Sequence, residues 1–384
     1  MKQFIGIFLI IGSTIGGGII GLPIAAVNLG FVGSLLAICL VWLIMTFTGL
    51  CILKISYNLP VKHNTYFSLS TKFLNFKGAK VTVFGGYLLI LYLTLTTYIS
   101  GISSSVSLYF AQNSNLSYLL SGVILVFILG GITTYNSRVI IKSNVVFVVA
   151  KLSLIIVAIF LIFYSTSKIT LSIDNYPIQS IGAFSFLFVL FNAFGYHFII
   201  PSLVKFYDNR ISFKSFVFLL IFSTTVIALI YIAWILAIFF TIPAEGSHGM
   251  MSIYNSKNQL IAFNNSISFF TQSYTISNML SAFQLISMIG SFCCISIGVI
   301  DALKDAFGQN AYIKVLICTY LPPLVLMSLS QNMFLIAMSL AGILTFYIEV
   351  FVPILGVRNY YKTSSKVKDK SLFSHQYSKF LVRS

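Results

Sequence analysis

Long apolar stretches separated by short polar segments make up most of this chain of 384 residues. A helix needs about 20 apolar residues to cross the hydrocarbon core of a bilayer, so the pattern predicts an all-α membrane protein with about ten transmembrane helices. The predicted spans are residues 3–27, 31–53, 81–112, 116–137, 143–167, 178–204, 215–244, 277–303, 310–329 and 333–357.

Lys and Arg residues are divided unevenly between alternate connecting segments. If the N-terminus lies inside the cell, 20 of the 23 fall on the cytoplasmic side, Lys168 and Lys257 fall outside, and Lys151 lies within a span. Cytoplasmic segments of membrane proteins carry such an excess of positive charge. We therefore expect a multi-pass membrane protein with both termini in the cytoplasm.

The composition agrees with a lipid environment. Only 8% of the residues are charged, whereas soluble domains carry about 25%. The formal charge of +16 would suggest a nucleic-acid partner in a soluble protein. Here the basic segments face the anionic cytoplasmic lipid surface, so we expect membrane lipid and no nucleic acid as a partner. The oligomeric state stays open.

The cysteines lie within apolar runs and show no paired metal-ligand spacing. We expect them to be small buried side chains rather than a metal site. They are Cys39, Cys51, Cys293, Cys294 and Cys318.

The first predicted span contains residues that disfavour a helix. Positions 12–23 hold five glycines and one proline. Each interior glycine costs a helix up to about 1 kcal/mol, and proline removes a backbone hydrogen bond. We expect an unwound segment here, which at membrane depth must be buried in protein or line a cavity. The alternative is that these glycines only allow close helix packing.

The sixth predicted span contains a similar interruption. Residues 192–201 read Asn-Ala-Phe-Gly-Tyr-His-Phe-Ile-Ile-Pro. Spans one and six are the first members of two sets of five, so the second set enters the membrane in the opposite sense. This is typical of an inverted repeat with its binding site near the midplane, where the discontinuous helices meet. We expect repeats over 1–167 and 168–357, followed by a basic cytoplasmic tail over 358–384.

The outside part of the second repeat includes a longer connection at about 245–276. Apolar residues recur in it in a pattern that predicts a short amphipathic helix over the outer mouth. These residues are Leu260, Ile261, Phe263, Ile267, Phe269 and Phe270.

Several short motifs follow one another along nearly the whole chain. They are the Gly-rich break with Leu22-Pro23 and Asn28-Leu29-Gly30-Phe31, Tyr98-Ile99-Ser100-Gly101, Ala150-Lys151, Phe194-Gly195-Tyr196-His197 with Pro201-Ser202, Gly298 with Asp301, and Leu321-Pro322-Pro323. In this set the chain resembles the bacterial tyrosine- and tryptophan-specific permeases. These form the hydroxy and aromatic amino acid permease family of the amino acid–polyamine–organocation superfamily.

The resemblance implies a LeuT-like, five-plus-five inverted repeat with helices 1 and 6 broken. It also implies a secondary transporter that imports tyrosine or tryptophan by proton symport with alternating access, the proton being the coupling ion and no cofactor being bound. Members usually have an eleventh helix, and this chain has its basic tail at that place. A carrier for a small hydroxy or branched aliphatic amino acid, or a sodium-coupled carrier, remains an alternative.

Other classes of membrane protein are disfavoured. The spans carry no HExxH or GxSxG motif and no cluster of acids, so an enzyme is not expected. The sequence holds no P-loop pattern for ATP-driven pumping, and no filter motif typical of a channel.

The two breaks supply the candidate substrate site. Gly16, Gly17 and Gly18 would offer backbone N–H groups to a carboxylate at the end of a half-helix. Phe194, Gly195 and Tyr196 would frame the substrate from the sixth span, and Tyr98 would present a ring from the third. His197 needs a polar partner in the membrane, either a tyrosine hydroxyl, the substrate or a proton.

Lys151 is the candidate for proton coupling. It lies about 12 Å into the fifth span at 1.5 Å per residue, deeper than a snorkelling lysine is usually found. A buried amine can take up and lose a proton near neutral pH, and proton-driven relatives of this fold use a lysine on this helix. A fixed, ion-paired lysine is the alternative. Asp301 is a second candidate on the proton path, and Glu349 is an intramembrane acid without an assigned role.

Overall fold

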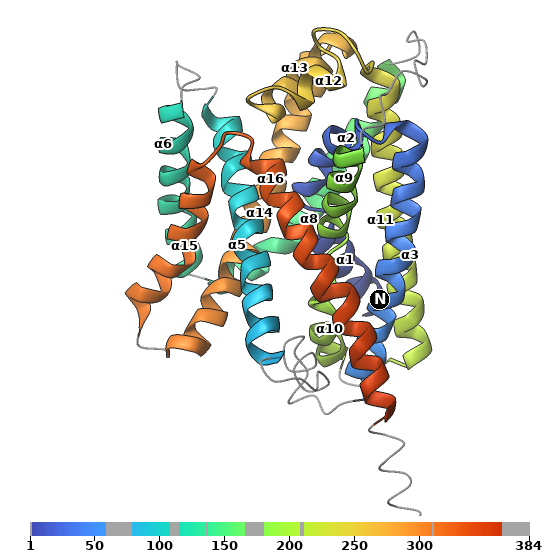
Figure 1. Ribbon diagram of the computed structural model, residues 1–384, viewed down its shortest axis with the longest axis vertical. Coiled ribbons are helices and arrows are strands. Elements are labelled where there is room, and N and C mark those ends of the chain that lie inside the picture. Colours follow the sequence, from blue (N-terminus) through green and yellow to red (C-terminus); the bar gives the residue numbers. More distant parts are fainter. Residues whose placement is uncertain are drawn as a thin grey trace, which may run out of the picture.

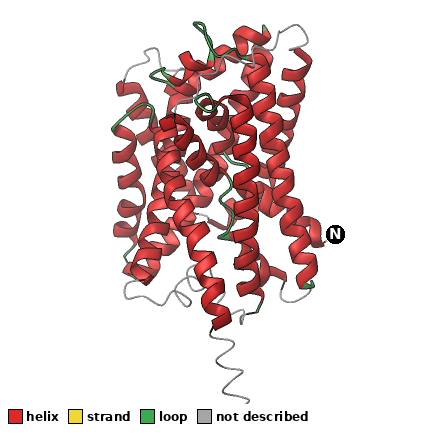
Figure 2. Cartoon of the chain, turned by 45° about the vertical axis from the view of Figure 1, so that its right-hand side comes forward, coloured by secondary structure: helices red, strands yellow, loops and turns green. Residues whose placement is uncertain are grey.

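The computed structural model describes residues 2–58, 79–107, 115–135, 137–165, 180–207, 211–308 and 311–362, and these residues form helices and no strands. Figure 2 shows the helices running side by side in one bundle. In chain order they are α1 (Lys2–Thr14), α2 (Gly18–Ala26), α3 (Gly30–Tyr57), α5 (Ala79–Ser107), α6 (Asn115–Leu125), η2 (Val126–Gly130), α7 (Gly131–Tyr135), α8 (Ser137–Ser165), α9 (Ser180–Ala193), α10 (Ile199–Tyr207), α11 (Phe213–Thr241), α12 (Met250–Tyr254), α13 (Gln259–Thr271), α14 (Tyr274–Phe307), α15 (Tyr312–Ser328), α16 (Met333–Thr345) and η4 (Phe346–Phe351). The elements η2 and η4 are short π-helices.

Helix occupies each of the stretches predicted to span the membrane. Among the described residues, seven helices are long and apolar enough to cross a bilayer, and the bent pair α1 and α2 makes an eighth. The predicted sixth and ninth spans correspond to shorter apolar helices, which include 182–193 and 312–328. The all-helical membrane architecture is confirmed, whereas the exact number of crossings stays a prediction.

Helix α3 shows how the apolar pattern is used. Leu36, Leu43 and Phe47 are more than half exposed, whereas Val41 and Met45 are fully buried. A helix that is apolar on all sides needs an apolar environment on its outer face as well. The exposed apolar side chains are therefore the surface that meets lipid.

The first break lies where the glycines predict it. Helices α1 and α2 are bent by 52° at residues 15–17. The second break, at residues 194–198, separates α9 from α10. Figure 1 shows α2 and α9 toward the end of the bundle that carries α12 and α13, with α1 and α10 toward the opposite end.

Side chains of α11 satisfy backbone carbonyls that the breaks release. The Tyr231 hydroxyl donates to the carbonyl of Ala193 at 2.8 Å and approaches that of Thr14 at 3.4 Å, so one side chain joins both breaks. Trp234 Nε1 donates at 2.9 Å to the carbonyl of Ile19 within α2, which lacks its usual helical partner because Pro23 has no N–H. Both rings are fully buried. Because lipid offers no hydrogen bonds, these contacts are what allow unwound backbone at this depth.

Helices α9 and α16 cross at very short range. A methyl group at Gly342 of α16 would overlap the backbone carbonyl of Phe188 in α9. Only glycine allows this approach without a backbone shift. The contact fixes α16, and the η4 turn that continues it, against the first half of the broken sixth span.

The connection between α11 and α14 contains the predicted short helix. Helix α13 buries Leu260, Phe263 and Ile267 against the bundle. Its Asn264 side chain exchanges two hydrogen bonds, at 3.1 and 2.9 Å, with the side chain of Gln284 on α14. The predicted basic tail lies almost wholly outside the described residues, which end at position 362.

Replacing Tyr231 with Phe should destabilise the protein by about 1–3 kcal/mol, because it leaves the carbonyl of Ala193 buried without its donor. Thermal unfolding of the purified protein in detergent measures this as a lower Tm. The matched control is Tyr274→Phe, since Tyr274 is 81% exposed. Equal Tm values for the two variants would contradict the bridging role of Tyr231.

Candidate functional site

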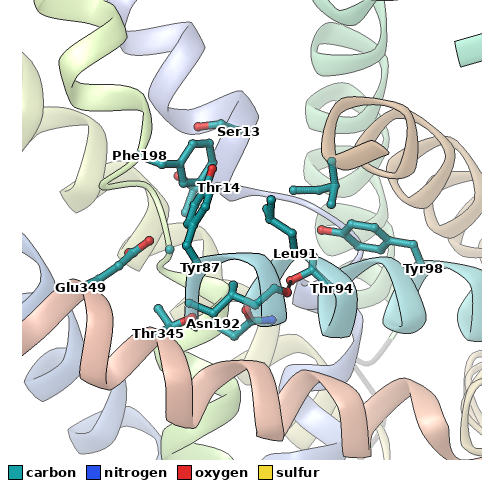
Figure 3. Close-up of a pocket in the computed structure, with 13 residues that line it drawn as sticks. Ser13, Thr14, Tyr87, Leu91, Thr94, Tyr98, Asn192, Phe198, Thr345 and Glu349 are labelled. Atoms are coloured by element: carbon teal, nitrogen blue, oxygen red, sulfur yellow. Dashed lines mark hydrogen bonds between the residues drawn. The ribbon is translucent and has the colours of Figure 1, made fainter. Parts of the chain in front are cut away.

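Two adjoining hollows beside the breaks form the candidate site, and we refer to them together as the central cavity. Their volumes are about 260 and 80 Å³. Both are lined by Ser13, Tyr87, Leu91, Tyr98, Phe198 and Ile295. The larger part adds Gly12, Lys151, Ile199, Ser291, Cys294 and Gly298, and the smaller part, drawn in Figure 3, adds Thr14, Ile90, Thr94, Asn192, Gly195, Thr345 and Glu349.

The central cavity lies on one side of the breaks. The end of α1 and the start of α10 line it, whereas no residue of α2 does. On the other side, Ile19 and Ile20 of α2 are fully buried, and so is Trp234 of α11. The cavity therefore extends from the breaks toward the end of the bundle opposite α12 and α13.

The predicted glycines lie next to the cavity rather than in its wall. Gly16 is buried beside the Tyr98 hydroxyl and Ser291, and Gly17 is buried beside Met288. Gly18 is half-buried at the first turn of α2. In the described part of the chain, the N–H groups of these three residues have no hydrogen-bond acceptor. They are the orphan donors that a helix N-terminus leaves.

Lys151 reaches the first break from α8. Its Nζ donates to the carbonyl of Gly12 at 2.5 Å, and the residue is only 5% exposed. Gly12 lies within the last turn of α1, where carbonyls lack partners along the helix. A positive charge is favourable at this end of a helix. Lys151 thus joins α8 to the first break, and it borders the larger part of the cavity.

The predicted residues of the sixth span divide between the cavity and the core. Gly195 lines the smaller part of the cavity. Phe194 is fully buried and packs edge-on against Tyr231, with ring centroids 5.0 Å apart. Tyr196 is also fully buried and donates its hydroxyl to the carbonyl of Met45 at 2.8 Å. Phe194 and Tyr196 are absent from the cavity lining among the described residues.

His197 and Glu349 meet in the interior. His197 Nδ1 and Glu349 Oε2 are 2.8 Å apart, at ion-pair distance but not in the alignment of a good hydrogen bond. The other ring nitrogen, Nε2, is 2.8 Å from Thr48 Oγ1 of α3. His197 is fully buried and Glu349 is 7% exposed at the cavity wall. A histidine predicted from the sequence is thus paired with an acid for which the sequence suggested no partner.

Asp301 does not join this group. It is exposed on α14 and borders a separate small pocket with Thr133, Lys304 and Tyr312. The central cavity and this pocket have no lining residue in common. Its place on a proton path stays a prediction.

Several cavity residues were not anticipated from the sequence. Tyr87 and Thr94 project from α5, Asn192 from the end of α9 and Phe198 from the second break (Figure 3). Tyr87 and Thr94 carry no local signal in an apolar helix. Asn192 and Phe198 fall inside the interrupted segment at residues 192–201, so the signal that marked the break could have identified them.

Comparison with known proteins agrees with the family resemblance found in the sequence motifs. The model of the tryptophan/tyrosine permease family matches residues 1–374. The chain is 26% identical to a tryptophan-specific transport protein of Shigella flexneri over 92% of this chain and 85% of that protein. It is 25% identical to a tyrosine permease of Enterobacter agglomerans, covering 91% and 85% of the two chains. A low affinity tryptophan permease of Escherichia coli (strain K12) is 24% identical over 92% and 86%.

One solved structure shows the same type of fold. It is the nucleobase-cation-symport-1 family transporter Mhp1, in a closed conformation with bromovinylhydantoin bound. The TM-score is 0.50 and the sequence identity is 13%, over 89% of this chain and 77% of the other. The likeness concerns the fold alone, and it confirms the predicted LeuT-like class.

The position of the cavity can be tested by cysteine labelling. With the native cysteines replaced, Ser13→Cys should react with a small thiol reagent, because Ser13 is exposed in the cavity wall. Ile15→Cys, two residues further and fully buried, should stay unlabelled. Mass spectrometry of the purified variants measures the labelled fraction. Equal labelling of the two positions would contradict the described cavity.

Proposed function

Because the chain belongs to the tryptophan/tyrosine permease family, we propose that it imports tryptophan or tyrosine across the bacterial inner membrane together with a proton. The family identifies a membrane permease rather than an enzyme. The substrate, the coupling ion and the direction of transport are the parts that we propose for this chain.

The observation that carries the coupling is the bond from Lys151 Nζ to the carbonyl of Gly12. A protonated amine holds the end of α1 to α8 through a charge-assisted hydrogen bond, which is stronger than a neutral one. When the amine loses its proton this attraction weakens, and α1 is free to move relative to α8. Protonation of Lys151 would then select one arrangement of the broken first span.

The same contact favours a proton over sodium as the coupling ion. The ammonium group already supplies a positive charge to the Gly12 carbonyl. A sodium ion at this carbonyl would have to lie next to that charge. Like charges at such a separation repel each other strongly in a medium of low dielectric constant.

The cavity offers complementary chemistry for an aromatic amino acid. The unpaired N–H groups of Gly16, Gly17 and Gly18 would bind the carboxylate once Tyr98 and Met288 give way. Tyr87, Tyr98 and Phe198 would contact the aromatic ring, since aromatic pairs gain energy beyond the area they bury. Gly195 has no side chain, so it would leave room for the substrate where the sixth span lines the cavity.

The position of the cavity supports alternating access. The excess of Lys and Arg in alternate connecting segments favours termini in the cytoplasm, and with that orientation the cavity would extend toward the cytoplasmic side. On this basis the conformation is the inward-facing one. The residues packed around α2 would close the path from the cavity to the outside of the cell, and α13 would lie over the outer end of that path.

Lys151→Ala should abolish accumulation driven by a pH gradient. One proton per substrate allows about tenfold accumulation for each pH unit, because 1.4 kcal/mol is a factor of ten. Reconstituted into proteoliposomes with the membrane potential held at zero, the wild-type protein should accumulate labelled tryptophan under a pH gradient and not under a sodium gradient. The variant should only equilibrate it.

Two controls accompany this experiment. Lys257→Ala removes an exposed lysine and should accumulate substrate like the wild type. Exchange of labelled for unlabelled substrate without any gradient should persist in Lys151→Ala, which shows that the variant is folded. If Lys151→Ala keeps full pH-driven accumulation, Lys151 is not the coupling group.

Counterflow separates the possible substrates. An aromatic ring buries about 150–250 Å², and each Å² of apolar surface contributes about 25 cal/mol. We therefore expect labelled tryptophan and tyrosine to exchange more than about tenfold faster than serine at equal low concentration. Leucine should exchange at an intermediate rate. Exchange of serine or leucine at the aromatic rate would overturn the proposed specificity.

A further inference from the structure

Hydrogen-bond acceptors outnumber donors in the wall of the smaller part of the central cavity. Four aliphatic hydroxyl groups line it, and each donates its proton to a carbonyl of its own helix at 2.7–3.0 Å; they belong to Ser13, Thr14, Thr94 and Thr345. A hydroxyl has one proton, so only its lone pairs remain for a ligand. The two phenols and the amide that also line this part each bring an acceptor together with their donor. The wall therefore favours a ligand that supplies a hydrogen-bond donor.

Glu349 is the strongest acceptor in this wall. It is 7% exposed, and Figure 3 shows its side chain pointing from η4 toward Tyr87 and Phe198. Within the described residues its Oε2 atom has no hydrogen-bond partner, because the nearby His197 Nδ1 is not aligned to donate. A carboxyl group keeps acceptor capacity in either protonation state, and a buried acceptor without a donor is unfavourable. The acid thus has the capacity to bind a donor from the cavity.

The larger part of the cavity has the opposite character. Lys151 borders it, and the unpaired N–H groups of Gly16, Gly17 and Gly18 lie beside it. Positive charge and free N–H groups favour an anion, whereas the acid and the acceptors of the smaller part would repel one. The carboxylate of an amino acid therefore belongs at the larger part.

The ammonium group of an amino acid has to stay with the carboxylate, since both are bonded to the same carbon atom. The group that can extend from there into the smaller part is the side chain. Tyr87, Tyr98 and Phe198 line both parts of the cavity, so an aromatic ring that reaches from one part to the other would pass among them. The far edge of that ring would then face Glu349.

We propose that the smaller part of the cavity is the subsite for a hydrogen-bond donor on the substrate's ring, and that Glu349 accepts this hydrogen bond. The donor is the indole N–H of tryptophan or the phenol O–H of tyrosine. This assignment rests on the proposed function for the class of substrate, and it makes Glu349 the residue that determines specificity. Phenylalanine has no such donor and would leave the acid unpaired, so the contact selects aromatic rings with a polar edge.

Gly195 leaves space beside the acid. A Cβ atom at this position would lie 3.7 Å from Glu349 Oε2 and 3.8 Å from Thr345 Cγ2. These are ordinary contact distances, so any atom beyond the Cβ would take up room next to both side chains. All three residues line the smaller part of the cavity, and the glycine therefore keeps room there for the edge of a ring.

Matched pairs of ligands test the contact in the wild-type protein. The purified protein in lipid nanodiscs binds labelled tryptophan, and unlabelled amino acids compete with it. The buffer contains no sodium, because an oxygen-rich pocket with a carboxyl group could also hold a hard cation. In β-(3-benzothienyl)alanine a sulfur atom replaces the indole N–H, and phenylalanine lacks the hydroxyl of tyrosine. We expect each analogue to bind about 10- to 100-fold more weakly than its partner, because the buried acceptor loses its donor.

The outcomes separate this assignment from the proposed function. Equal affinities within both pairs of ligands would contradict the ring subsite and leave an aromatic amino acid carrier in place. Failure to bind either tryptophan or tyrosine would overturn the proposed function, and the ring subsite with it.

Variants of Glu349 separate recognition from structure. Glu349→Leu removes the acceptor, so the ratio of the affinities for tryptophan and benzothienylalanine should fall to about one. Glu349→Gln keeps a carbonyl oxygen and should retain most of the ratio. A purely structural role would weaken both ligands alike, and an unchanged ratio in Glu349→Leu would therefore rule out Glu349 as the acceptor. Glu245→Gln, at an exposed acid in the connection after α11, should match the wild type. The comparison in the wild type decides the question even if Glu349→Leu does not fold.

Discussion

The structure depends on how carbonyl groups released from a helix find hydrogen-bond donors inside a membrane. Two spanning helices are interrupted, and lipid cannot solvate the backbone that the interruptions expose. The donors come from side chains of neighbouring helices. Tyr231 serves both breaks, Trp234 serves the start of α2, and Lys151 serves the end of α1. The permanent donors fix the fold, whereas the ionisable donor makes one of these contacts depend on protonation.

This distinction separates two kinds of contact within one small region. Tyrosine and tryptophan keep their donor hydrogens at any physiological pH. Lysine and histidine have protons that can be exchanged, and here they lie at different breaks. Each of the two breaks therefore has its own contact with an ionisable side chain.

Much of this could be predicted from the sequence because its causes are local. Glycine and proline content located both breaks, apolar length located the spans, and the depth of Lys151 in its span singled it out. The residues that these positions contact in the folded protein could not be predicted in the same way. The contact between His197 and Glu349 joins positions far apart in the chain, and it depends on the side of the last spanning helix on which η4 presents Glu349. The cavity residues of α5 likewise depend on which face of an apolar helix points inward. The glycines show the same limit, since composition predicted unpaired N–H groups but not the Tyr98 and Met288 side chains that lie against them.

The close approach at Gly342 has a mechanical consequence. Two helices in backbone contact cannot slide past one another by exchanging side-chain rotamers, because there is no side chain at the point of contact to adjust. Helices α9 and α16 should consequently move together as one rigid body. Bending is then left to the interrupted segments themselves, at residues 15–17 and 194–198.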